Sequence, residues 1–119
     1  MTPGIAVPLI PMYIRLAGVR VDPEGRAYIR RKLRSRFAKF GASIERVSVR
    51  MEDLNGPRGG VDQVCRIKVV ISGHPSVVFE NRGTTLEAAV DGALDGVERT
   101  VRRRVQRRRM APFKRRNPT

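Results

Sequence analysis

Hydrophobic periodicity constrains the fold of this chain most, because it switches between two values along the sequence. Apolar residues recur at helical spacing in residues 23–40 and 86–101, whereas the segments before and between them alternate at period two. A period of 3.6 residues places an apolar stripe on a helix, and a period of two places an apolar face on a strand. The pattern predicts amphipathic helices that cover one face of a β-sheet.

Start signals precede the first helix. Asp22, Pro23 and Glu24 supply an N-cap, a first-turn proline and an acid at the positive end of the helix. The expected buried stripe consists of Ile29, Leu33, Phe37 and Phe40. The expected exposed basic face consists of Arg30, Arg31 and Arg34. Arg36 falls close to the apolar stripe, so either its head group passes the edge of the core or the helix is rotated.

Four segments alternate as strands do. The predicted strands are residues 12–16, 44–54, 64–71 and 76–81. Turn-forming residues separate the last three, and we expect the final two strands to form a hairpin. Inward-pointing positions are Val47, Val49, Met51, Cys65, Ile67, Val69 and Ile71, with Arg66 and Lys68 on the other side.

The second helix begins after a predicted capping box that runs from Thr84 to Glu87. Its apolar stripe consists of Leu86, Val90, Ala93, Leu94, Val97 and Val101. Gly92 and Gly96 each weaken a helix by about 1 kcal/mol relative to Ala, so we expect packing on the sheet to hold this one. Its polar face changes from acidic to basic along the helix, an order that the helix dipole alone can explain.

The order strand, helix, three strands, helix predicts an α+β fold. It is a two-layer sandwich, β-α-β-β-β-α, with a four-stranded sheet and two helices on one face. We expect an N-terminal extension over residues 1–11, one domain over residues 12–106, and a basic tail or the start of a linker over residues 107–119. The tail is expected to be flexible when free.

The charge balance indicates a polyanionic partner. The chain has 25 Lys and Arg against 11 Asp and Glu, a formal net charge of +14. Ten of the basic residues and none of the acidic ones lie in residues 99–119. Such a block is typical of a specific contact or of a disordered tail, and the sequence leaves both interpretations open.

Several kinds of chemistry lack the residues they need. The chain has one cysteine, Cys65, and one histidine, His74, and no phosphate-binding glycine loop. We therefore expect no disulfide, no metal, no cofactor and no enzymatic activity on a small molecule. Cys65 is expected to be a small buried residue. Asp91 and Asp95 are expected either to pair within the chain or to keep RNA away from that end of the helix. No apolar run reaches transmembrane length, which favours a cytoplasmic protein without a membrane partner.

The stretch from Ala88 to Arg99, AAVDGALDGVER, resembles the second helix of the ribosome hibernation promoting factors. These proteins are also called ribosome-associated inhibitors or sigma-factor modulation proteins. Supporting segments are Val21–Glu24, Tyr28-Ile29, Lys32-Leu33 and Val47–Glu52. The resemblance covers about residues 12–109. The chain departs from the family pattern at Gly25, Glu87 and Gly96.

The resemblance implies a fold like the double-stranded-RNA-binding domain with an added strand. It implies a bacterial stress and stationary-phase factor that binds the small ribosomal subunit in the decoding channel, where mRNA and tRNA bind. Such a factor contacts rRNA with basic helix faces and inhibits translation while stabilising idle ribosomes. Long family members dimerise through a further C-terminal domain, which this chain lacks, so we expect either a short form or a fragment of a long form.

Arginine suits such a site because its planar fork contacts phosphate oxygens in pairs and releases counterions. The predicted rRNA-binding residues are Arg26, Arg30, Arg31, Arg34, Arg99, Arg102, Arg103, Arg104 and Arg107. Three alternatives stay open: a solvated basic face on an ordinary helix, a general structured-RNA-binding protein, and a basic module that docks on an acidic protein or a membrane.

Overall fold

The computed structural model describes residues 10–17, 21–53 and 63–110, and side chains as far as residue 106. Its elements are β1 (Met12–Ala17), α1 (Pro23–Phe37), the 3₁₀ turn η1 (Ala38–Phe40), β2 (Ile44–Asp53), β3 (Gln63–Ile71), β4 (Val77–Gly83) and α2 (Leu86–Met110). The predicted element order is confirmed. Helix α2 continues four residues beyond the domain boundary expected at residue 106. Apart from residues 10 and 11, the expected N-terminal extension lies outside the described residues, as does most of the expected tail.

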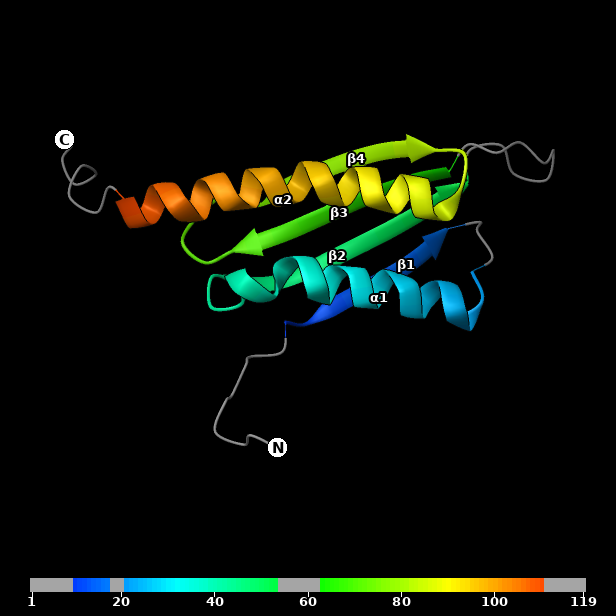
Figure 1. Ribbon diagram of the computed structural model, residues 1–119, viewed down its shortest axis with the longest axis horizontal. Coiled ribbons are helices and arrows are strands. Elements are labelled where there is room, and N and C mark those ends of the chain that lie inside the picture. The colour runs from blue at the N-terminus through cyan, green and yellow to red at the C-terminus, as the bar shows by residue number, and fades with distance from the viewer. Residues whose placement is uncertain (1–9, 18–20, 54–62, 111–119) are drawn as a thin grey trace, which may run out of the picture.

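The four strands form one mixed sheet in the order β1-β2-β3-β4. Strand β1 pairs parallel with β2, and the two remaining pairs are antiparallel. A parallel pair needs a crossover connection, and α1 supplies it. Both helices lie on one face of the sheet, α1 beside β1 and β2 and α2 beside β3 and β4, as Figure 1 shows. The two helices run parallel, so both end at the same end of the molecule (Figure 1).

The core lies between the helices and the sheet. All four residues of the stripe predicted for the first helix are buried, as are all seven predicted inward strand positions. The buried residues of α2 are Ala89, Val90, Ala93, Leu94, Val97, Val101 and Val105. Among the described residues the core contains no buried polar or charged side chain. Hydrophobic burial therefore holds the two layers together, at about 1.5–3 kcal/mol for each large side chain.

The two helices begin at threonine and aspartate caps, one of them displaced from its prediction. Asp22 accepts a hydrogen bond from the Gly25 amide at 2.8 Å, as expected. In α2 the cap is Thr85, whose hydroxyl oxygen accepts from the Ala88 amide at 3.0 Å, so the capping box predicted from Thr84 was wrong by one residue. Adjacent threonines are equivalent caps in sequence. The helix begins at Leu86, which makes the later one the residue that precedes the first turn.

The two glycines inside α2 allow β4 to approach the helix closely. A Cβ atom on Gly96 would overlap the ring of Phe79, and one on Gly92 would overlap the amide of Asn81. That amide donates to the carbonyl oxygens of Ala88 and Ala89, both at 3.3 Å. Packing on the sheet thus compensates for the low helix propensity of glycine, as expected.

Replacing Gly96 by alanine should destabilise the protein, although alanine is the better helix former. The new methyl group meets the rigid Phe79 ring, and overpacking of this kind costs about 1–3 kcal/mol against about 1 kcal/mol gained in propensity. Urea unfolding should show the loss, and G96A combined with F79L should recover part of it. A stability gain in G96A would contradict the contact.

Cys65 is fully buried on β3, and burial raises the pKa of its thiol from 9.0 to about 12. The thiol stays protonated in the folded protein while the unfolded chain ionises near 9, so this contribution to stability is present below pH 9 and is lost as the pH rises toward 12.

We expect native Cys65 to react with a disulfide reagent at pH 8 about 1,000-fold more slowly than in urea, because three pKa units separate the two thiolate populations. A colorimetric thiol assay measures both rates. Equal rates would show that the thiol is accessible in the folded state.

Candidate nucleic-acid interface

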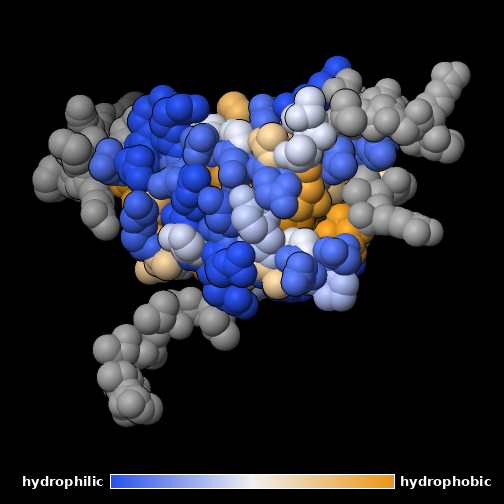
Figure 2. All heavy atoms as spheres, turned by 45° about the vertical axis from the view of Figure 1, so that its right-hand side comes forward, coloured by the Kyte–Doolittle hydropathy of each residue, from blue (hydrophilic) through white to orange (hydrophobic). Residues whose placement is uncertain are grey.

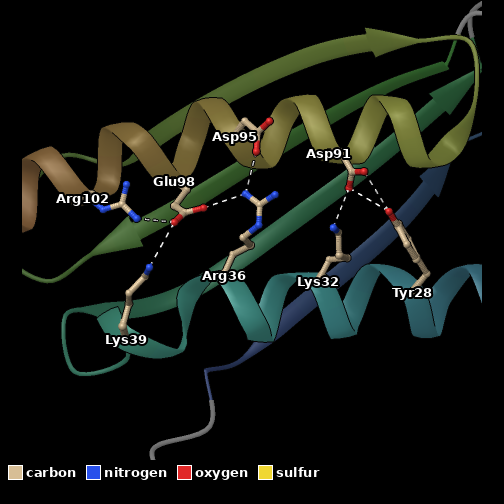
Figure 3. Close-up of polar contacts among 8 residues, drawn as sticks. All are labelled: Tyr28, Lys32, Arg36, Lys39, Asp91, Asp95, Glu98 and Arg102. Atoms are coloured by element: carbon tan, nitrogen blue, oxygen red, sulfur yellow. Dashed lines mark hydrogen bonds and ion pairs between the residues drawn. The ribbon is translucent and has the colours of Figure 1, made fainter.

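The facing sides of α1 and α2 are joined by a series of polar contacts (Figure 3). At the start of the series, the Tyr28 hydroxyl donates to Asp91 at 3.0 Å, and the Lys32 ammonium lies 3.5 Å from the same carboxylate. Burial, followed by this hydrogen bond, raises the pKa of Tyr28, so its hydroxyl remains a donor. One helix thus supplies the cation and the donor, and the other supplies the acid.

Further along, Arg36 bridges two carboxylates of α2. Its Nη1 atom donates to Asp95 Oδ1 at 2.9 Å and to Glu98 Oε1 at 2.8 Å (Figure 3). Arg36 was predicted either to pass the edge of the core or to indicate a rotated helix. Its head group passes the edge of the core and contacts α2. The expected intramolecular pairing of Asp91 and Asp95 is confirmed.

Glu98 is the centre of this series, with a side chain only 12% exposed. It also accepts from Arg102 Nη2 at 2.8 Å and lies 3.6 Å from the Lys39 ammonium. Because Arg36 reaches it from the C-terminal end of α1 and Lys39 from η1, Glu98 holds this end of α1 against α2. We call Tyr28, Lys32, Arg36, Lys39, Asp91, Asp95, Glu98 and Arg102 the interhelical network.

Outside the network, α1 presents a row of arginines. Arg26, Arg30 and Arg34 follow one another at intervals of four residues. Each lies two positions from a network residue of α1, which is 200° around the helix, so the row is turned away from α2. None of their three side chains has a hydrogen-bonding or ionic partner in the described part of the chain. Arg31 is exposed and lies 5.8 Å from the centre of the Tyr28 ring.

The predicted arginines of α2 divide into two groups. Arg99 and Arg103 are exposed, one turn apart, and have no partner among the residues that the structure describes. Arg102 belongs to the network, and Arg104 donates to the Pro75 carbonyl oxygen at 3.0 Å in the turn between β3 and β4. The side chain of Arg107 lies outside the described part of the structure. The basic end of α2 is therefore only partly available.

Charge is also divided along the helices. At the end where both helices begin, a groove of about 860 Å³ is lined in part by three acids, Asp22, Glu24 and Glu87, with one cation, Arg31, and apolar Leu86. Figure 2 shows hydrophilic side chains over most of the helix face and an apolar area toward this end. The opposite end carries the arginines of α2. A polyanion is thus favoured along the outer sides and the C-terminal ends of the helices.

The open face of the sheet carries basic residues that sequence analysis did not assign to a site. Arg15, Arg50, Arg66 and Lys68 are all exposed there. Alternation had already placed Arg66 and Lys68 away from the core, and that pattern was the available signal. Cross-strand register, which brings them beside one another, was not visible in the sequence.

Residues 13–109 match the family described as Sigma 54 modulation protein / S30EA ribosomal protein. The chain belongs to this family. It is a family of ribosome hibernation and subunit interface proteins, which are ribosome-binding factors and not enzymes. The resemblance noted in the sequence is therefore confirmed.

Solved structures share the fold. A ribosomal subunit interface protein from Coxiella burnetii matches with a TM-score of 0.70 at 13% identity, over 82% of this chain and 99% of that one. The N-terminal domain of Protein Y from Thermus thermophilus matches with a TM-score of 0.65 at 20% identity, over 80% and 98% of the two chains. No curated protein sequence matches the chain. In the described residues no helix has the length and apolarity needed to cross a membrane.

Truncating Glu98 should destabilise the fold by about 1–3 kcal/mol, because E98A leaves the half-buried Arg36 without its shorter ion pair. D95A is the matched control: the Asp95 side chain is 62% exposed, so its loss should cost less than about 1 kcal/mol. Urea unfolding of E98A, R36A and the double variant measures the coupling, and additive losses would show that the two side chains do not interact.

Proposed function

We propose that this protein is a ribosome hibernation factor that binds the small ribosomal subunit in the decoding channel. Arginines on the outer sides of the two helices contact rRNA phosphates, and the bound domain excludes mRNA and tRNA and so inhibits translation while the idle ribosome is stabilised. Membership of a ribosome-binding family supports this role. The proposal places the protein in the cytoplasm, in bacterial stress and stationary phase.

One structural observation carries the assignment of the surface. The acidic side chains on the facing side of α2 are paired within the interhelical network, whereas Arg30, Arg34, Arg99 and Arg103 have no partner in the described part of the chain. The acids of the same helices therefore do not neutralise these arginines. In a chain with a formal net charge of +14, these four arginines are therefore available to attract and contact phosphates.

The network also reduces the cost of binding. It fixes α1 against α2, so the two sets of arginines keep their relative positions before RNA arrives. A preorganised surface loses less conformational entropy on association than flexible side chains on mobile elements do. Inhibition requires no chemistry, because occupancy of the channel is sufficient to exclude mRNA and tRNA.

The decisive experiment is co-sedimentation with purified small subunits over a range of salt concentrations. We expect the variant R30Q/R31Q/R34Q/R99Q/R103Q to bind weakly and to lower the magnitude of the log-log salt slope by about 3.5–4.5, for five phosphate contacts. A variant with glutamine at Arg108, Arg109, Lys114, Arg115 and Arg116 removes the same charge from the C-terminal end, and should retain most of the binding.

The reverse result, with binding lost only in the C-terminal variant, would assign the contact to the tail. Inhibition of cell-free translation should fall in parallel with sedimentation. Excess duplex RNA should compete poorly with subunits for the protein. Competition as strong as that of unlabelled subunits would favour a general RNA-binding protein.

A further inference from the structure

The open face of the sheet, opposite the helices, carries an unusual row of like charges. Arg15 on β1 is paired in register with Arg50 on β2, and Arg50 is paired with Arg66 on β3. All three side chains are exposed. Neighbouring strands are only about 4.8 Å apart, so the three arginine side chains leave the backbone side by side across the sheet.

This row disfavours folding, because like charges directly opposite one another on adjacent strands repel. Relief within the protein is slight. Arg66 Nη1 lies 3.9 Å from Glu80 Oε2, an exposed pair, while the side chains of Arg15 and Arg50 have no hydrogen-bonding or ionic partner in the described part of the chain. A polyanion would supply the missing counter-charge.

A second row lies beside the first and adds an aromatic ring. Tyr13, Ser48, Lys68 and Val78 are aligned across the four strands. Tyr13 is 58% exposed and Val78 is 43% exposed, and these are the large hydrophobic residues that the described surface leaves open. Tyr13, Arg15, Ser48, Arg50, Arg66 and Lys68 line a shallow depression of about 250 Å³, with Val49.

The combination of a ring and cations distinguishes between kinds of polyanion. Base–aromatic stacking needs a base whose face is free, and cations beside the ring then reach the phosphates that flank that base. In a duplex the base faces are covered by their neighbours, whereas unpaired RNA segments expose them. An acidic peptide would pair with the arginines and leave the ring without a partner.

We propose that this open sheet face is a second RNA-binding surface, which takes a single-stranded segment by stacking a base on Tyr13 and holding its phosphates with Arg15, Arg50 and Lys68. The surface is separate from the helix faces of the proposed function and does not depend on them. Because it lies on the other side of the sheet, both surfaces can be occupied at once.

Binding of a fluorescein-labelled ten-nucleotide single-stranded RNA by the full chain, followed by anisotropy at low salt, tests the proposal. Y13A should weaken binding about 5- to 100-fold, and Y13F should stay within about threefold of the parent because the ring remains. R15Q/R50Q/K68Q should lower the magnitude of the log-log salt slope by about 2, for three contacts on a single strand.

The chain has two tyrosines and no tryptophan, so tyrosine emission reports on stacking directly. Unlabelled RNA should quench the emission of the parent protein, and Y13F should abolish most of that quenching. The matched control R30Q/R34Q/R99Q removes the same charge from the helices and should keep the quenching.

Four results would overturn the proposal: unchanged binding in Y13A, an equal loss in the two triple variants, equal affinity for a duplex of the same length, or equal affinity for polyglutamate. Urea unfolding keeps the test valid, since R15Q/R50Q/K68Q relieves repulsion and should be at least as stable as the parent. If the parent protein fails to bind small subunits but still binds the single-stranded RNA through Tyr13, the proposed function is contradicted and this second surface is not.

Discussion

The contacts between α1 and α2 decide where the positive charge of this protein is free to act. Both helices are rich in charge, and they lie side by side because each buries an apolar stripe on the same face of the sheet. Charges of the same sign on the two facing sides would repel each other, whereas here cations of α1 face acids of α2. Glu98, in the middle of α2, and Arg36, at the C-terminal end of α1, join the helices there, and Asp91 joins them nearer their start. On the described parts of the two helices, positive charge without an internal partner thereby lies on their outer sides.

The same arrangement depends on a close approach between α2 and the sheet. Gly92 and Gly96 let Asn81 and Phe79 of β4 contact the helix backbone, which larger residues would prevent. This contact positions α2 along the sheet, and the position of α2 places its acidic residues opposite the cations of α1. A packing constraint on one side of the helix thus determines the electrostatics on another side.

The two faces of the molecule use charge in different ways. On the helix face, acids and bases are interleaved and the unpaired arginines flank a neutralised centre. On the sheet face, arginines are aligned across three strands beside an exposed tyrosine, and the ion pair of Arg66 with Glu80 is long and exposed. The first pattern suits a rigid contact with folded rRNA. The second suits an unpaired strand whose bases are open to stacking.

Local sequence determined the elements, their buried faces and the family, because hydrophobic period and helix caps are properties of neighbouring residues. The stripe from Ile29 to Phe40 and the inward positions of β3 could be predicted for that reason. Tertiary structure alone decided which charges meet. Arg36 is ambiguous on a helical wheel, and it bridges the helices only because α2 lies beside it. The sequence predicts Arg104 to be exposed, but the β3–β4 turn places the Pro75 carbonyl within hydrogen-bonding distance of it. Arg15, Arg50 and Arg66 are aligned only because their strands, which are distant in sequence, pair in this register. Ion pairs and cross-strand rows depend on the distances between elements, and the order of the elements does not fix those distances.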